Sequence, residues 1–315
     1  MTAARSERDL KLLVFIAVIL AVSAGGLGSE PYTNVASLWD LGEGARSLAL
    51  GGAFIGLVDD SSAVNCNPAG LAWCSGLSLA SSAETRPATA GHGHVTARLQ
   101  NLGMSVHYFD FGDVPETDEF GNVIGTFSYR NYGLLAATSV SASNIPILSS
   151  MQLADCIAFG LSTKLVIVDT LELGDGSGFA ADLSFLLRLD DPWFAGPLLA
   201  RLAFGMVAEN LFAVPVTYNS GHTESWEKRV SIGLSAEALE QFVACMEVRS
   251  TEALHLGLEW SPVPALALRC GLKRDGIWIC SFGLGVRPAN YVFDYALVLH
   301  PYLSNQHRAS FAVSW

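Results

Sequence analysis

Few residues in this sequence have the types and spacing of a catalytic or metal-binding site. His92 and His94 are two residues apart, which on a strand places both imidazoles on one face, but no other ligand supports them. We interpret them as residues at a wet rim and expect no metal. No Cys-x-x-Cys, Gly-x-Ser-x-Gly or phosphate-loop pattern is present. Serine, histidine and aspartate are available, which leaves a lipase as an alternative, but no spacing singles out a nucleophile. We therefore expect no catalytic residue, no enzyme activity and no cofactor.

The six cysteines would allow up to three disulfides in an exported chain. Cys66 and Cys74 flank an Asn-Pro-Ala turn and are the first pair to consider. Cys270 and Cys280 fall on an apolar strand face, nearly opposite each other across a turn at 274–276, where we interpret them as small hydrophobic residues. A cross-strand disulfide there is an alternative, although that geometry is usually strained.

Ionisable side chains recur at alternating positions, opposite the apolar face of the predicted strands. The main members of this set are Lys164, Asp182, Arg201, Glu209, Arg229, Glu247, Glu259, Arg269, Asp294 and Arg308. Both signs occur, so we expect pairs across neighbouring strands. These residues are either a polar conduit or ligand site, or a structural network that fills an interior. We favour the network, because an unpaired buried charge is costly.

The overall composition narrows the class of protein that positions these residues. Half of the residues are hydrophobic and only 15% are charged, against about a quarter in a typical soluble domain. The net charge of -12 argues against a nucleic-acid partner, which needs a basic surface. Two classes of protein remain: a membrane protein without obvious membrane helices, or a very apolar secreted β protein.

Residues 1–24 have the pattern of a cleaved secretory signal peptide. Basic residues precede an apolar run at 12–22, and small residues follow it. A membrane anchor is the alternative, but this run is too short to cross about 30 Å of hydrocarbon as a helix. No later stretch has 18 consecutive apolar residues, so the mature chain would cross a membrane only as strands.

From Leu77 onward the sequence alternates with the period of a β-strand. In residues 253–261, three leucines and Trp260 share one face, while His255, Gly257 and Glu259 share the other. The second face is too small and too sparsely charged for a solvent surface. It suits the interior of a barrel whose apolar side meets lipid, so we predict an all-β, transmembrane antiparallel β-barrel.

About 14 strand segments are predicted, an even number as in bacterial single-chain barrels. They are 77–85, 92–100, 103–111, 126–140, 156–168, 178–188, 199–209, 228–236, 241–249, 253–261, 264–273, 277–286, 290–300 and 306–315. With the C-terminus in the periplasm, the outer loops are 86–91, 112–125, 169–177, 210–227, 250–252, 274–276 and 301–305. The segment 141–155 is then an unusually long inner connection, although its Asn, Pro and Ser residues are typical of turns.

A glycine-rich segment precedes the first strand, and its features suit a compact piece packed inside the barrel. Asn67 can cap a short helix that begins at Pro68, and an aspartate at 59 or 60 can cap an earlier turn. Gly51 and Gly52 allow close approach of the backbone.

Residues 42–72 resemble the start of the PorV/PorQ family, which belongs with the long-chain fatty acid transporter (FadL-like) outer-membrane barrels. The matching elements are Gly44-Ala45-Arg46, Gly51-Gly52-Ala53-Phe54, Asp59-Asp60 and Asn67-Pro68-Ala69-Gly70-Leu71. Segments 256–260, 268–271 and 294–296 also look like that family, so the resemblance spans nearly the whole mature chain.

The resemblance implies that the N-terminal segment forms a hatch in the lumen. The domains are then a signal peptide at 1–24, a helical plug at 25–76 and an outer-membrane barrel at 77–315. The plug motif comprises Gly51, Gly52, Ala53, Asp59, Asp60, Asn67, Pro68 and Ala69. A periplasmic cap packed below the barrel is the alternative place for this segment.

Two functions follow for a barrel in the bacterial outer membrane, surrounded by lipid. The first, implied by the resemblance, is the passage of hydrophobic small molecules, which predicts an apolar pocket beside the plug and a gap in the wall. The second is a PorV-like partner or shuttle for secreted proteins, which predicts a filled lumen and a binding surface at loops 112–125 and 210–227. Phe212, Tyr218 and Trp226 are either interface anchors or, as we favour, aromatics at the membrane interface.

Overall fold

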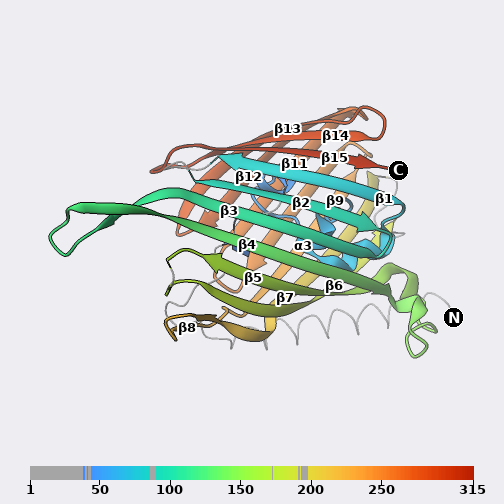
Figure 1. Cartoon of the computed structure of the whole chain (residues 1–315). Helices are drawn as coiled ribbons and strands as arrows, with labels where there is room; N and C mark the ends of the chain where they lie inside the picture. The colour runs from blue at the N-terminus through green and yellow to red at the C-terminus, as the bar shows by residue number, and fades with distance from the viewer. Residues whose placement is uncertain are drawn as a thin grey trace.

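The computed structural model describes residues 38–39, 41, 44–85, 90–171, 173–190, 192 and 198–315. The predicted signal peptide, residues 1–24, lies outside this part, as does most of 25–43. The described part is nearly all sheet (Figure 1). It contains no helix with the length and hydropathy needed to cross a membrane.

The strands form one closed antiparallel barrel. Their bounds are β1 Leu77–Thr85, β2 Gly91–Leu99, β3 Leu102–Thr117, β4 Val123–Ser141, β5 Ile157–Asp169, β6 Gly176–Asp190, β7 Leu199–Tyr218, β8 Thr223–Glu224, β9 Arg229–Ala238, β10 Phe242–Arg249, β11 Leu254–Val263, β12 Leu266–Asp275, β13 Ile277–Val286, β14 Tyr291–Leu299 and β15 Gln306–Ser314. The first strand pairs with the last, and β6 pairs with β7. The two-residue β8 pairs only with the last residues of β7 and is not a separate strand of the wall. The described wall therefore has 14 strands, as predicted.

The exposure of the side chains follows the two predicted faces. On β11, Leu258 and Trp260 are 57% and 43% exposed, whereas His255 and Glu259 are 2% and 4% exposed. The same alternation of outward apolar residues with inward small or ionisable ones continues around the wall. The apolar rows therefore form the outside of the barrel.

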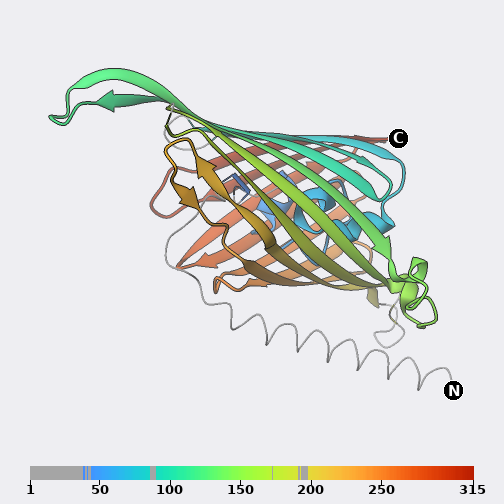
Figure 2. The same ribbon diagram turned by 60° about the horizontal axis from the view of Figure 1, so that its bottom comes forward.

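Two hairpins are longer than the sequence predicts. Strands β3 and β4 continue through most of the expected loop 112–125, past a register shift between Asp110 and Asp113, and project beyond the rest of the barrel (Figure 2). Strand β7 likewise takes in residues 210–218 of the expected loop 210–227. The β7 extension stays in the wall, because it pairs with the first half of β6, whereas the β3–β4 extension has no further strand beside it.

The long connection between β4 and β5 is compact. Two short 3-10 helices, η4 (Ala142–Asn144) and η5 (Ala154–Cys156), lie at its ends. Ala142, Ala154 and Ile157 form a small core there. The length of this connection is thus accommodated by a folded cap and does not disturb the barrel.

The cysteines do not form the disulfides considered above. No disulfide joins any of the six, all of which lie in the described part. Cys74 Sγ instead lies 3.6 Å from the carbonyl oxygen of Gly70. Cys270 and Cys280 are not opposite each other, because the register pairs Cys270 with Phe282 and Cys280 with Leu272.

Candidate functional site

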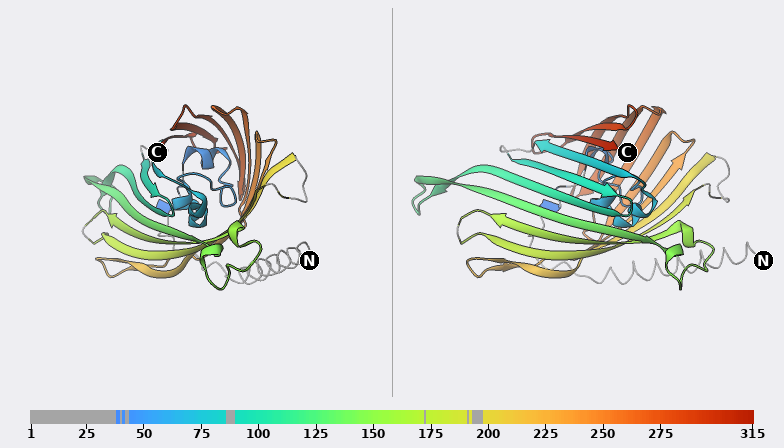
Figure 3. Two further views of the ribbon diagram at one scale, coloured as in Figure 1. Left: turned by 90° about the vertical axis from the view of Figure 1, so that its right-hand side faces the viewer. Right: turned by 45° about the vertical axis from the view of Figure 1, so that its right-hand side comes forward.

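The N-terminal segment, defined here as residues 44–76, lies within the ring of strands (Figure 3). It contains helix α2 (Ala45–Ala49), helix α3 (Ala63–Cys66) and the 3-10 helix η2 (Pro68–Trp73). Helix α2 contacts β12 to β15, whereas η2 contacts β4 to β6. The segment therefore bridges two separate parts of the wall across the lumen.

Small residues bring α2 against the wall. Ala45 and Ala49 are fully buried and pack on Ala296 of β14. A Cβ atom added to Gly283 of β13 would lie 2.3 Å from the Cβ atom of Ala49. Real Cβ contacts are never this short, so the close approach of α2 requires glycine at position 283.

A row of inward glycines extends this surface along neighbouring strands. A Cβ atom at Gly205, Gly257 or Gly271 would lie 2.2, 2.7 or 2.1 Å from backbone atoms of the N-terminal segment. A Cβ atom at Gly233 would lie 2.8 Å from the backbone nitrogen of Gly56. The sequence showed that this face is small, but not that its glycines form a docking surface.

The turn after α2 is bonded to the wall through buried polar groups. Gly51 and Gly52 have φ of 70° and 84°, which glycine adopts without strain. The His255 ring Nδ1 donates to the carbonyl oxygen of Gly51 at 2.6 Å. The Ser281 hydroxyl accepts from Gly51 N–H and donates to the carbonyl oxygen of Ala49, both at 3.1 Å.

The next part of the segment is held by Glu247 of β10. This carboxylate accepts hydrogen bonds from the backbone N–H groups of Phe54 and Ile55 at 3.0 and 3.2 Å. Arg249 pairs with the other carboxylate oxygen at 2.9 Å. Ala53, beside these bonds, is buried in the apolar core that the segment shares with the wall.

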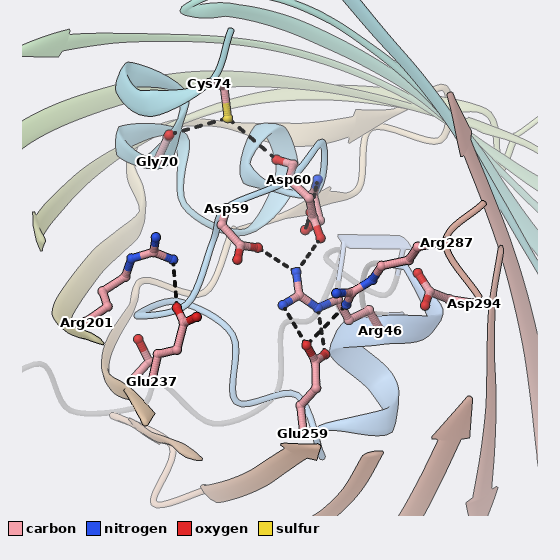
Figure 4. A network of polar contacts seen from close by, with 12 residues as sticks. Arg46, Asp59, Asp60, Gly70, Cys74, Arg201, Glu237, Glu259, Arg287 and Asp294 are labelled. Carbon is pink, nitrogen blue, oxygen red and sulfur yellow. Dashed lines mark hydrogen bonds and ion pairs between the residues drawn. The ribbon is translucent and has the colours of Figure 1, made fainter. Parts of the chain in front are cut away.

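Arg46 links three carboxylates inside the barrel (Figure 4). Its guanidinium lies 2.5 Å from Asp59, 2.9 Å from Asp60 and 3.0 Å from Glu259 of β11. Burial lowers the pKa of Arg46, but the three carboxylates outweigh burial and raise it well above its usual value. For Asp60 the effects have the opposite signs: burial raises the pKa, whereas Arg46 and hydrogen bonds from Ser62 lower it. The net result is a pKa below the usual value.

Glu259 carries this cluster into the wall. Besides Arg46 it binds Arg269 at 2.6 Å and Arg287 at 3.1 Å. Arg269 in turn contacts Asp294 at 2.6 Å. We call Arg46, Asp59, Asp60, Glu259 and Arg269 the Arg46 cluster.

Asn67 anchors the other end of the segment. It is fully buried, and its side-chain oxygen caps η2 by accepting from Ala69 N–H at 3.1 Å, with Pro68 as the first residue of the helix. Its amide nitrogen donates to the carbonyl oxygens of Ile55 at 2.9 Å and Phe185 of β6 at 3.2 Å. One side chain thus caps η2 and fixes it to the wall.

The other inward charges from the sequence analysis are also paired. The pairs are Lys164–Asp182 at 2.9 Å, Arg201–Glu237 at 3.2 Å, Arg229–Glu209 and Arg308–Glu84. All four pairs join neighbouring strands: β5 with β6, β7 with β9 twice, and β1 with β15. These pairs fit the structural network that we favoured over a polar conduit, because each of these charges has a partner of opposite sign.

A cavity of about 330 Å³ lies between the segment and strands β1, β2, β14 and β15. Arg46, Asp60, His94, Arg98 and Arg287 contribute polar groups to it. This cavity is therefore not the apolar pocket that was expected beside the plug. An apolar hollow of about 740 Å³ lies instead on the outer face of the wall, lined by residues such as Leu234, Met246, Leu258 and Phe282.

The expected gap in the wall is also absent, since hydrogen-bonded neighbours close the ring in the described strands.

Two further groups of residues lie differently from the sequence expectation. His92 and His94 are buried in the barrel and not at a wet rim, and His107 joins them from β3. Trp226 is buried, and its ring N–H donates to the carbonyl oxygen of Val214 at 2.9 Å, so it is not an exposed anchor. Phe212 remains 67% exposed.

The geometry is that of a closed antiparallel β-barrel with a chain segment across its lumen, and comparison with solved structures supports this fold. The chain matches no family model and no curated protein. It is similar to the monoaromatic hydrocarbon channel CymD, with a TM-score of 0.59 and 13% identity over 90% of this chain and 99% of that one. It is also similar to the toluene transporters TodX of Pseudomonas putida (TM-score 0.54, 13% identity, 86% and 96% covered) and TbuX of Ralstonia pickettii (TM-score 0.55, 11% identity, 89% and 100% covered). At these identities the likeness shows the shared fold.

Proposed function

We propose that this chain is a bacterial outer-membrane channel that admits small hydrophobic molecules, with residues 44–76 as its plug. The observation that carries the proposal is a closed 14-strand barrel whose lumen is bridged by a segment bonded to the wall at both ends. The channels of the same fold named above carry toluene and other monoaromatic hydrocarbons. We take such a hydrocarbon as the substrate class to test first.

The Arg46 cluster is the contact that would have to open. The bonds from Arg46 to Asp59 and Asp60 lie within the segment, whereas its bonds to Glu259 join the segment to the wall. The segment can therefore move with Arg46, Asp59 and Asp60 still paired, while Glu259 stays with Arg269 and Arg287. Little unpaired charge is created, which lowers the cost of opening.

Uptake of labelled toluene tests this proposal. The chain is expressed in a host bacterium that has no hydrocarbon channel of its own, with empty vector as the baseline. We expect uptake above the baseline for the wild type, and a several-fold higher initial rate for Arg46→Gln. Arg274→Gln is the control, because Arg274 lies at a turn and contacts Trp278 outside the lumen. Wild-type and Arg46→Gln uptake at the baseline, with both barrels folded, would refute the channel function.

The β3–β4 hairpin favours a second candidate function, a PorV-like partner of secreted proteins. It projects beyond the other strands (Figure 2), and near its tip Phe120, Val123 and Ile124 are strongly exposed. Exposed apolar residues on a protruding hairpin are typical of protein contacts. Photo-crosslinking from position 120 in cells tests this: discrete protein adducts support it, and lipid or no adducts contradict it.

A further inference from the structure

Three histidines from neighbouring strands meet inside the barrel. His92 and His94 lie on β2 and His107 lies on β3, where the register pairs it directly with His94. All three are buried, and one ring nitrogen from each lies within 4.8 Å of the others. The ring centroids of His94 and His107 are 4.9 Å apart. The sequence pair at 92 and 94 thus gains the third imidazole that it lacked.

The contacts of His107 favour a proton on its Nε2. Nε2 lies 3.2 Å from Asn65 Oδ1, an oxygen that only accepts hydrogen bonds, and 3.0 Å from the Ser105 hydroxyl, which can donate or accept. The Asn65 side-chain nitrogen lies 3.2 Å from Thr96 Oγ1, with the amide oxygen toward His107. A proton on Nε2 satisfies Asn65 Oδ1 and leaves a lone pair on Nδ1 of His107.

This lone pair is buried without a partner. Nδ1 of His107 and Nδ1 of His94 have no hydrogen-bond partner among the described residues. A buried polar atom without a partner destabilises a fold by about 1–3 kcal/mol, and such atoms are rare in native proteins. Two such atoms in one cluster of imidazoles are placed to bind a group that accepts lone pairs.

We propose that His92, His94 and His107 bind a divalent transition-metal ion, with Zn²⁺ as the representative. Neutral imidazole is a preferred ligand of Zn²⁺, and three protein ligands with one open position are common at such sites. Metal–nitrogen bonds of about 2.0–2.1 Å require the three nitrogens to approach to about 3.4 Å, so the rings rotate toward the ion on binding.

A carboxylate and a polar cavity lie beside the cluster. Glu84 Oε2 lies 3.8 Å from His92 Nδ1, where a carboxylate can orient an imidazole ligand. Arg308 pairs with the same carboxylate, which balances its charge. His94 also lines the polar cavity beside the N-terminal segment, so a dissolved ion reaches the cluster through that space.

The site lies where the N-terminal segment meets the wall. His107 is hydrogen-bonded to Asn65, the next-to-last residue of α3. Trp39 packs on the His107 ring, with ring centroids 4.8 Å apart. A bound ion would hold His107 in the orientation that Asn65 requires. Metal binding is independent of the transport proposal, because neither needs the other to occur.

Cobalt and zinc titration of the purified, untagged barrel in detergent tests the site. We expect one Zn²⁺ per barrel by calorimetry, and a Co²⁺ visible spectrum of nitrogen ligands without a near-ultraviolet thiolate band. His107→Gln and His94→Ala should each lose binding by at least about 100-fold. Asn65→Ala should weaken it by about 10–100-fold, because Asn65 orients a ligand without touching the ion.

His222→Gln is the matched control, since His222 is exposed and lies in the outer part of the β7–β8 hairpin. Its binding should equal that of the wild type, and circular dichroism should show that every variant folds. The proposal is overturned if the wild type binds no ion, if His94→Ala and His107→Gln bind like the wild type, or if the cobalt spectrum shows thiolate ligands. The wild-type measurements remain decisive even if a variant does not fold.

Discussion

Arg46 is the residue on which the contact between the N-terminal segment and the wall depends most. Its three carboxylate partners come from within the segment and from β11. Of these carboxylates only Glu259 is buried, whereas Asp59 and Asp60 are partly exposed to solvent, which screens their charge. Two measurements on single residues test how Arg46 and its carboxylates hold the segment.

The first test is the acid stability of the segment. The folded-state pKa of Asp60 is lower than its usual value, so its contribution to stability is complete above the ordinary carboxyl pKa of about 3.9 and is lost as the pH falls toward the folded-state pKa. We expect the thermal stability difference between the wild type and Asp60→Asn to be constant at pH 5–7 and to shrink below about pH 4. A difference that does not change with pH would contradict a role for ionised Asp60.

The second test uses Cys74 as a reporter of segment release. Burial raises the pKa of the Cys74 thiol to about 11, so little thiolate is present at pH 8. We expect iodoacetamide to label Cys74 slowly in the folded wild type and at least about 10-fold faster in Arg46→Ala, as read by peptide mass spectrometry. Cys156, which lies in η5 away from the segment, is the internal control and should label at one rate in both proteins. Equal Cys74 rates would show that Arg46 does not hold the segment.

Single-residue chemistry was the hardest feature to predict from the sequence. The inward position of Glu259 and Arg269 followed from strand alternation, but their contact with Arg46 depends on where the segment docks. His107 was missed because only the register of β2 and β3 brings it opposite His94. Sequence periodicity identifies the face of a strand and carries no information on register.

At the scale of elements, α2 and η2 fix the two ends of the segment. Helix α2 has only five residues and no side-chain cap, so its stability comes from packing on the wall and not from helix propensity. The 3-10 helix η2 depends in the same way on Asn67 and its wall contacts. Changes on the wall should therefore displace these elements.

A valine at position 283 should push α2 off the wall. The added side chain would overlap Ala49, so we expect Gly283→Val to keep a folded barrel but to increase protease cleavage within residues 44–76. Gly91→Val is the matched control on β2, because a Cβ atom there meets nothing within 4 Å. Cleavage of Gly283→Val at the control rate would mean that the close approach of α2 is not required.

Asn67 should be far more sensitive than an ordinary helix cap. Asn67→Ala removes three buried hydrogen bonds, at about 1 kcal/mol or more each, so we expect a loss of about 3 kcal/mol in unfolding free energy. Asn67→Asp keeps the cap to Ala69 but cannot donate to Ile55 and Phe185, so it should also be destabilised. If urea unfolding shows Asn67→Asp equal to the wild type, the side chain acts only as a cap.

The strands themselves were predicted well, because an apolar outer face on one side and a packed lumen on the other impose strict alternation. Most predicted bounds agree with the structure within two or three residues, as for β13 at 277–286. The extensions of β3 and β4 were missed, because Gly112, Asp113 and Pro115 are typical of turns. The apolar rows of the outer face do not continue along these extensions, so the periodic signal in the sequence ends before the strands do.

At the scale of the whole molecule, the barrel holds its charges inside and its apolar rows outside. Exposed leucine, phenylalanine, tyrosine and tryptophan side chains cover the described wall, while ion pairs and glycines face the N-terminal segment. In water such a surface would drive aggregation, whereas in a bilayer it is covered by acyl chains. The proposed arrangement therefore places lipid outside the wall and the N-terminal segment within it.

Fluorescence quenching by brominated lipids measures that placement directly. Two single-tryptophan variants are reconstituted in vesicles, one keeping Trp260 on the outer face of β11 and the other keeping Trp73 in η2. We predict strong quenching of Trp260 by dibrominated acyl chains and little quenching of Trp73. Equal quenching of the two residues, or a Trp260 that the brominated lipid does not reach, would contradict a lipid-facing outer wall around a lumenal segment.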